Sequence, residues 1–262
     1  MNAVNKVGSV AAGLAAALCL GAGAAPTAVQ AQSFGISGEI GFGARVRQQY
    51  FGAEGYGVSP RGRGSLESLT FGPISSGEPG VARDPEGFGV RGAVRLVPGR
   101  SASDFSELAG LKDVPFSLEL GMGVAYEMEN ARVFVDVRNG VIGHGAWVSE
   151  IGGDVIYRPT DRMTISAGPR LFFGSDDYAN TYFGVTAAEA GASAFSAFDA
   201  SGGLLSSGFE VRVDQRLNDD WSIRGELEYS RFLNDAGASP IIQEADHAIF
   251  NLTLARRFSF GF

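Results

Sequence analysis

Residues 248–262 alternate between large apolar side chains and small or polar ones. The apolar side carries Ala248, Phe250, Leu252, Leu254, Phe258, Phe260 and Phe262, and the other side carries Asn251, Thr253, Ala255, Arg257, Ser259 and Gly261. Arg256 is the one misfit on the apolar side. A strand of a membrane barrel needs this alternation, because one face meets lipid and the other meets a polar lumen. The pattern predicts an outer-membrane β-barrel, and with it the outer membrane as the location.

Residues 1–31 have the features of a secretory signal peptide. Lys6 supplies a positive charge, residues 7–25 are rich in Ala, Leu and Gly, and a Val-Gln-Ala sequence follows as a cleavage site. A transmembrane helix is the alternative, but no second long apolar run follows. The only cysteine, Cys19, lies in the segment to be removed. We therefore expect a mature chain without a disulfide, a thiolate metal site or a cysteine nucleophile.

The remaining residues, 32–262, are within the size range of a single domain. The chain is 45% hydrophobic, yet no segment of this part is apolar enough to cross a bilayer as a helix. Apolar content that is spread out as alternation is typical of a barrel. The net charge of -8 argues against nucleic acid as a partner, because nucleic-acid binding requires a basic face.

The same alternation recurs in nine earlier segments. They are residues 36–50, 59–71, 88–96, 116–126, 132–138, 147–157, 162–173, 205–216 and 221–229. In each segment we assign the apolar residues, such as Leu205 and Leu227, to the lipid-facing side. Polar residues such as Ser222 are assigned to the lumen.

The positions of the tight turns constrain the number of strands. Both chain ends are expected in the periplasm, which requires an even number of strands, and turns at Pro159–Asp161 and Asn218–Asp220 are expected there too. The simplest solution has ten strands and makes residues 174–200 one long external loop. The alternative has twelve, with added strands at residues 178–186 and within 70–75. We predict an all-β, antiparallel, up-and-down barrel of about ten strands.

The predicted lumen carries both signs of charge, interspersed. Its charged residues are Glu39, Arg45, Arg47, Arg61, Arg63, Glu67, Arg91, Arg95, Glu119, Arg132, Asp136, Arg138, Glu150, Asp154, Arg170, Glu210, Arg212, Asp214, Arg224, Glu226 and Glu228. Small barrels have little interior space, and buried charges must be paired or solvated. We expect ion pairs that hold the lumen together. The alternative is a substrate-selective channel.

Candidate catalytic groups are few. The two histidines are His144, expected in a turn between Gly143 and Gly145, and His247, expected to be exposed at the start of the last strand. A serine–histidine pair that uses Ser149 or Ser239 has no supporting motif. The acidic residues Asp176, Asp177 and Asp199 lack the spacing of a metal-binding loop. We expect no enzymatic activity and no catalytic, cofactor-binding or metal-binding residues.

Several stretches resemble a known family when they are taken in order and spacing. They are Tyr50-Phe-Gly-Ala-Glu54, Gly143-His-Gly145, Ala167-Gly-Pro-Arg170, Tyr178-Ala-Asn-Thr-Tyr-Phe-Gly-Val185 and Asn234-Asp-Ala-Gly-Ala-Ser-Pro-Ile241. Over nearly the whole mature chain the sequence is similar to the MipA/OmpV family of outer-membrane proteins. It departs from the family at Gln48-Gln49, where a proline before the tyrosine is usual, and at residues 191–193, which lack the usual Ser-Gly pair.

The resemblance implies a non-enzymatic role. The family is named for interaction with a lytic transglycosylase that cleaves murein, and the member that gives the name is regarded as a scaffold between that hydrolase and a peptidoglycan synthase. Other members are discussed as adhesins or as stress and antibiotic-response proteins. The resemblance thus implies an envelope scaffold in contact with outer-membrane lipid. A small channel, an adhesin or a stress-response barrel is the alternative.

Overall fold

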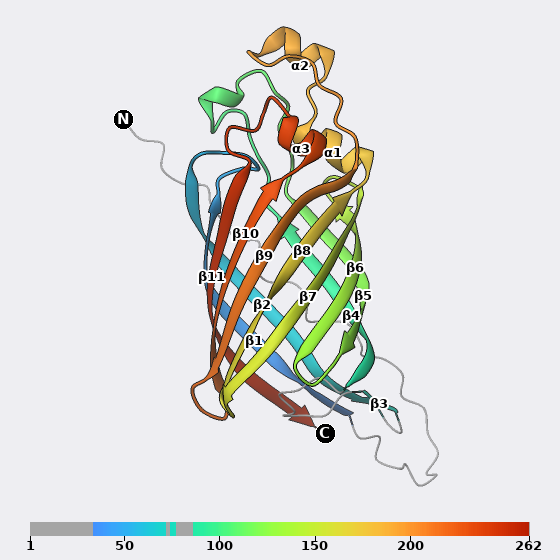
Figure 1. The fold of residues 1–262 in the computed structure, drawn as a ribbon, viewed down its shortest axis with the longest axis vertical. Helices are drawn as coiled ribbons and strands as arrows, with labels where there is room; N and C mark the ends of the chain where they lie inside the picture. Colours follow the sequence, from blue (N-terminus) through green and yellow to red (C-terminus); the bar gives the residue numbers. More distant parts are fainter. Residues whose placement is uncertain (1–33, 72–73, 77–85, 262) are drawn as a thin grey trace, which may run out of the picture. The chain divides into compact units, whose positions relative to one another are not determined.

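Ten long strands follow one another around a single antiparallel sheet in a computed structural model of the chain (Figure 1). The structure describes residues 34–71, 74–76 and 86–261, with the backbone alone for 65–71 and 74–76. The long strands are β1 (Phe34–Gln48), β2 (Tyr56–Phe71), β4 (Gly87–Val97), β5 (Ser117–Glu127), β6 (Ala131–Ile142), β7 (Trp147–Thr160), β8 (Met163–Gly174), β9 (Gly203–Arg216), β10 (Trp221–Phe232) and β11 (Asp246–Gly261). The short elements are β3 (Ile74–Ser76), the 3-10 helix η1 (Ser106–Leu108) and the helices α1 (Asp176–Phe183), α2 (Ala187–Ala192) and α3 (Asn234–Ala238).

The first and last long strands of the chain pair with each other within the curled sheet. β1 pairs with β11 from Gly35 opposite Gly261 to Val46 opposite Phe250. From β11 the strands follow in reverse chain order to β4, while β2 and β3 lie on the other side of β1. All consecutive strands except β3 and β4 are therefore neighbours in the sheet, as in an up-and-down barrel. The predicted fold class is confirmed.

The two ends of the barrel differ (Figure 1). At one end lie the end of β11 and the tight connections 128–130, 161–162 and 217–220; we call it the turn end. At the other end lie the long connections with α1, α2 and α3; we call it the cap end. Outer-membrane barrels have short periplasmic turns and longer extracellular loops, so the turn end corresponds to the periplasmic side.

The prediction of ten strands is confirmed for the long strands. The alternative of twelve is wrong at 178–186, while the end of its other added segment, 70–75, lies in the three-residue strand β3. The turns Pro159–Asp161 and Asn218–Asp220 both lie at the turn end, as expected. Residues 178–186 contain most of helix α1 instead of a strand, because Tyr178 and Tyr182 recur at helical spacing. The segment expected to be one long loop, 174–200, thus holds two helices.

The predicted facing of the strands holds along most of the sheet. Large apolar residues such as Phe88, Val155 and Leu227 are exposed on the outside, and polar residues such as Glu119 and Asn251 are buried. The facing of Leu205 was predicted incorrectly. Phe172 pairs with Ser206 and Phe173 with Leu204, so a bulge at Leu205 inverts the alternation, and its side chain is buried inside.

Two predictions fall outside the described residues: the signal peptide at 1–31 and the terminal Phe262. Among the described residues, no helix is long and apolar enough to span a membrane. The described barrel presents its large apolar side chains outward and buries its apolar clusters at the cap end. This arrangement is inverted relative to a water-soluble sheet, and it fits a lipid environment.

Candidate functional site

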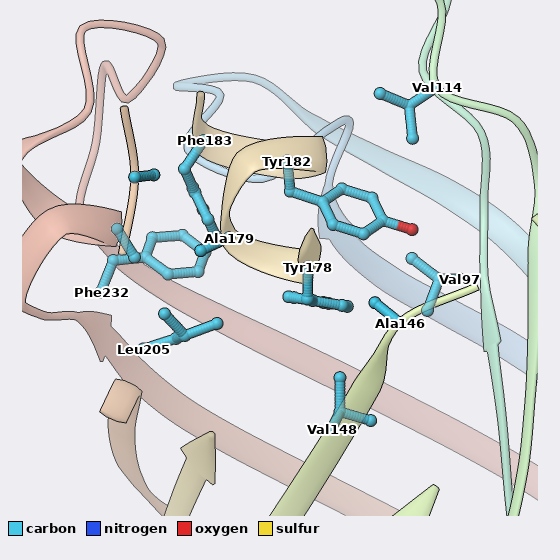
Figure 2. Packing of buried hydrophobic residues seen from close by; sticks show 12 residues of the cluster. Val97, Val114, Ala146, Val148, Tyr178, Ala179, Tyr182, Phe183, Leu205 and Phe232 are labelled. Atoms are coloured by element: carbon cyan, nitrogen blue, oxygen red, sulfur yellow. The ribbon is translucent and has the colours of Figure 1, made fainter. Parts of the chain in front are cut away.

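Four of the five segments that carry the family resemblance meet at the cap end, while Ala167–Arg170 lies within β8. Helix α1 lies at the centre of an apolar cluster there, and Figure 2 shows its residues Tyr178, Tyr182 and Phe183 beside residues from several strands and loops. The buried members of the cluster are Val97, Val114, Ala146, Val148, Tyr178, Ala179, Tyr182, Phe183, Ala200, Leu205, Phe232 and Ala236. Fully burying a large apolar side chain stabilises by about 1.5–3 kcal/mol. The cluster therefore fixes α1 in the mouth of the barrel.

Hydrogen bonds complete the attachment of α1. The helix leaves carbonyls without partners at its C-terminus, and two side chains satisfy them. Ser239 Oγ donates to the Phe183 carbonyl at 2.6 Å, and Arg100 Nη1 donates to the Tyr182 carbonyl at 3.2 Å. Asp176 and Asp177 lie in the first turn, where negative charge favours the helix dipole. The segment Asn234–Ile241 is thus attached to the C-terminus of α1 through Ser239.

His144 lies below α1 and is fully buried, whereas the sequence predicted an ordinary turn histidine. Its ring contacts Tyr178 and Tyr182 edge-on, with centroids 5.1 and 5.8 Å away. The backbone N–H of Ala146 donates to Nδ1 at 3.0 Å, so the proton of the neutral ring is on Nε2, 3.4 Å from Glu119 Oε1. Burial lowers the pKa of His144, against the attraction of Glu119. The buried histidine therefore connects the tyrosines of α1 with Glu119 in the lumen.

The tight turn before His144 explains how the side chain reaches this position. Gly143 has φ +91°, a conformation that side-chain-bearing residues rarely adopt. A Cβ atom there would lie 2.1 Å from Ser117 Oγ. Ser117 Oγ accepts hydrogen bonds from the backbone N–H of His144 and from the Tyr182 hydroxyl, the latter at 3.3 Å. The Gly-His-Gly motif thus turns the chain tightly against Ser117 and aims the imidazole inward.

This group of Ser117, His144 and Glu119 has the residue types of a catalytic triad without its geometry. A triad requires an imidazole nitrogen that accepts the proton of the serine hydroxyl. Here the ring nitrogens face the Ala146 N–H and Glu119, and the serine contacts the histidine backbone. The arrangement supports packing and hydrogen bonding, and it does not activate a nucleophile.

The other predicted candidates lie apart from this group. His247 was expected to be exposed, but its inward-facing ring is half-buried and stacks on Phe232 with centroids 4.4 Å apart. The reason is that Phe232 turns into the cap cluster beside it. Ser239 is engaged with the Phe183 carbonyl, and Ser149 lies on β7 opposite Val137 and Phe173. The structure brings neither serine together with a histidine ring among the described contacts.

The three acidic residues that were considered as metal ligands have different surroundings. Asp176 Oδ1 accepts a hydrogen bond from the Gly202 N–H at 2.7 Å, and Asp177 is exposed on α1. Asp199 lines a surface hollow of about 570 Å³ together with Asn180 and Thr186. Within the described residues, no group of three or more histidine, cysteine or carboxylate side chains is placed to hold a metal ion.

A second apolar cluster ties the remaining cap loops together. Its buried residues are Tyr50, Ala53, Leu108, Leu111, Val185 and Ile241. Gly52 has φ +85°, and its carbonyl accepts hydrogen bonds from Gln243 and Glu244 N–H at 2.8 and 3.0 Å. The Tyr50 hydroxyl donates to Glu107 at 3.2 Å, and burial raises the pKa of Tyr50 to about 12, so the hydroxyl keeps its proton. The four loops 49–55, 98–116, 175–202 and 233–245 thus pack together, and we call them the cap.

Ion pairs fill the lumen below the cap. One chain of pairs runs Arg61–Glu226–Arg212–Glu210–Arg170–Asp154–Arg132–Glu127, and a second runs Arg91–Asp136–Arg138–Glu119–Arg95. The chains join residues from β2 and from β4 through β10. Arg61 reaches across β1 and β11 to Glu226 on β10, at 2.7 Å. Removing one partner of a buried pair costs about 3–5 kcal/mol. The predicted salt-bridged lumen is present.

The strand assignment from the sequence missed Phe134 as a lumen residue. Its ring is buried, with guanidinium carbons of Arg91, Arg132 and Arg170 at 4.2, 5.8 and 5.2 Å from its centroid. These distances are those of cation–π contacts. A signal existed, because Phe134 falls between Arg132 and Asp136 in the polar register of β6.

Comparison with known proteins gives a family match over most of the barrel. A family model described as MltA-interacting protein MipA matches residues 40–258. Outer membrane protein Omp26La of Vibrio anguillarum is 35% identical over 88 residues, which are 34% of this chain and 34% of that protein. The match thus spans about a third of the length of that curated relative.

Solved structures that are similar to the chain are outer-membrane barrels of low sequence identity. The CymD monoaromatic hydrocarbon channel is 10% identical, with a TM-score of 0.37 over 86% of this chain and 88% of that one. The NanC porin is 8% identical, with a TM-score of 0.36 over 85% of this chain and 98% of that one.

Proposed function

Because the chain belongs to the MipA family and is an outer-membrane barrel, we propose that it is a non-enzymatic scaffold of the cell envelope. In this proposal it binds a lytic transglycosylase of the MltA type at the turn end and brings it to a peptidoglycan synthase. The family name refers to interaction with MltA, and the family is not known as enzymatic. The transglycosylase acts in the periplasm, and the turn end is the periplasmic end.

The observation that carries the proposal is the occupied lumen. Ion pairs run along the inner wall, between neighbouring strands such as β7 and β8 and, through Arg61 and Glu226, between β2 and β10, and α1 is buried in the mouth above them. Arg170, for example, holds both Asp154 and Glu210, at 2.7 and 2.8 Å. A barrel whose inward charges are paired with one another, and whose mouth holds a packed helix, offers partners its outer surfaces. This supports binding over transport.

The turn end presents a preorganised surface. Residues 217–220 and 159–162 are exposed, and hydrogen bonds fix both turns. Asn218 Oδ1 accepts from the N–H groups of Asp220 and Trp221 at 3.0 and 2.9 Å, and the backbone N–H of Arg162 donates to Thr160 Oγ1 at 3.3 Å. Rigid groups lose little conformational entropy when they bind. These turns therefore support the docking role that we assign to them.

Binding of a purified MltA-type transglycosylase to the refolded barrel tests the proposal. Replacing residues 159–161 and 218–220 with plain Gly-Asn turns should weaken capture by at least about tenfold, or 1.4 kcal/mol. A matched control replaces exposed residues of α2 at the cap end, for example Ala188→Asn, and should leave capture unchanged. Capture that survives both turn replacements, or that is lost with the α2 control, would contradict docking at the turn end.

The same preparation discriminates scaffold from channel and from enzyme. In planar bilayers the wild-type barrel should give no stable single-channel current, and regular current steps would favour the channel. In cells, the double variant His144→Gln and His247→Gln should retain the envelope phenotype if it folds. A variant that captures the partner normally, yet reproduces the deletion phenotype, would favour an enzymatic role.

A further inference from the structure

Arg256 is a cation on the lipid-facing side of the barrel. The outward register of β10 and β11 carries three charged side chains: Arg231, Asp246 and Arg256. The outward positions of the other strands are uncharged in the part of the chain whose side chains the structure describes. A charge on this face needs an explanation, because a cation that faces lipid is destabilising unless it finds a partner or reaches the membrane interface.

The two outward arginines differ in their partners. Arg231 pairs with Asp246 at 3.0 Å at the cap end, and Asp246 also accepts from the Tyr229 hydroxyl at 3.0 Å. Arg256 lies at the turn end and makes no ion pair with any described carboxylate, including Asp219 and Asp220 of the adjacent turn. Among the described side chains, the barrel therefore supplies a counterion for Arg231 and none for Arg256.

The surroundings of Arg256 are those of a membrane interface. It is paired across the sheet with Trp221 on β10 and with Ile40 on β1, and all three residues are exposed. Its guanidinium carbon lies 5.7 Å from the Trp221 ring centroid, within cation–π range. Farther along β11, Phe258 and Phe260 place their rings 5.6 Å apart. Aromatic girdles of this kind mark the level of the lipid headgroups.

We infer that Arg256, held against Trp221, binds the phosphate group of a phospholipid in the periplasmic leaflet. The guanidinium presents a planar fork of donors that matches a phosphate, and its aliphatic stem can lie along the apolar wall. Phosphate is the anion that a lipid presents at this depth, so the lipid supplies a counterion that none of the described carboxylates provides. The contact fixes the depth of the turn end in the bilayer, and it is independent of the scaffold proposal.

Fluorescence of Trp221 provides a direct test. The chain has two tryptophans, so Trp147→Phe leaves Trp221 as the single reporter. The refolded barrel is titrated, in maltoside micelles, with phosphatidylglycerol that carries brominated chains, and brominated detergent serves as the reference. Arg256→Gln should raise the lipid fraction at half-quenching by about fivefold, because one basic residue near a membrane surface contributes about 1 kcal/mol. Arg256→Lys should retain part of the preference, and Arg231→Gln should leave it unchanged.

Native mass spectrometry of the same variants measures bound lipid directly, so a change in quenching that reflects only the surroundings of Trp221 can be recognised. The wild type and Arg231→Gln should retain more bound phosphatidylglycerol than Arg256→Gln. Equal lipid retention and equal quenching in wild type and Arg256→Gln would overturn the inference. So would release of the lipid by inorganic phosphate as readily as by unlabelled phosphatidylglycerol, because the site would then bind free anions. Heat-modifiable migration in gels confirms that each variant is folded before it is compared.

Discussion

The ring of Phe134 fills the space that a side chain at position 152 would need. Phe134 on β6 and Gly152 on β7 are paired across the sheet, and a Cβ atom at Gly152 would lie 2.4 Å from the Cζ atom of the ring. Arginines cover the ring, with Arg91 at 4.2 Å and Arg170 at 5.2 Å from its centroid. The glycine therefore makes room for an aromatic ring within a charged lumen.

Gly152→Ala should destabilise the barrel by about 1–3 kcal/mol, because the ring, surrounded by arginines, has little room to move away from an added methyl group. The matched control is Gly153→Ala, where a Cβ atom would meet its nearest neighbour at an ordinary 3.4 Å. Urea unfolding of the refolded barrel in micelles measures both. Equal midpoints for the two variants would contradict the steric account.

Charge substitutions at Leu227 and Ser222, both on β10, should differ sharply. Leu227 is exposed on the lipid-facing side, so Leu227→Arg should cost about 2–4 kcal/mol if it lies near mid-bilayer. Ser222 Oγ donates to Glu39 at 3.3 Å inside the barrel, so Ser222→Arg gains a nearby carboxylate and should be milder. Urea titration in lipid vesicles compares the two variants. Similar losses would mean that the facing of β10 is wrong.

The stability of the cap should fall below neutral pH through His144. Burial lowers the pKa of this histidine in the folded protein from its ordinary value of 6.5. Between the folded and unfolded pKa values the unfolded chain binds more protons, so stability rises with pH. The contribution is fully present above about pH 6.5 and is lost as the pH falls through the folded pKa.

His144→Gln separates this effect from the titration of other groups. At pH 7.5 the variant should lose about 1–3 kcal/mol, because Glu119 and the tyrosines of α1 lose their buried partner. Between pH 7.5 and pH 5.5 its stability should fall less than that of the wild type. Urea midpoints across this range provide the measurement, and parallel curves for the two proteins would refute the assignment.

Ser239→Ala should loosen α1 without unfolding the barrel. The substitution removes the buried bond to the Phe183 carbonyl, worth about 0.5–1.5 kcal/mol. Limited proteolysis should then cut residues 184–202 faster than in the wild type, whereas the exposed control Ser103→Ala should not change the rate. An unchanged cleavage rate for Ser239→Ala would show that the apolar cluster alone holds the helix.

The strands could be predicted from the sequence because each one obeys a local rule. Lipid on one side and a lumen on the other impose a period of two on every strand, so residues such as Phe250 and Asn251 reveal their facing to a single-sequence reading. Parity of the turns then gave the strand number. The assignment failed at Leu205, where a bulge changes the alternation, because a bulge depends on pairing with β8.

The cap could not be predicted in the same way, because its contacts join residues that are far apart in the chain. The sequence marked the individual segments of Tyr50, His144, Tyr178 and Ser239 but gave no distances between them. Only the curled sheet brings these segments to one end, where their apolar side chains leave water together.

The pairing of charges and the surroundings of the outward arginines also depend on the tertiary structure. Alternation assigned Arg61 and Glu226 to the lumen, but curvature of the wall determined that they meet at 2.7 Å. Arg256 was visible in the sequence as a misfit. Only the structure places it beside Trp221 and away from any described carboxylate, which indicates a lipid contact. Local alternation follows from the solvent on each side of a strand, whereas the pairing of charges depends on distances that exist only once the sheet has curled.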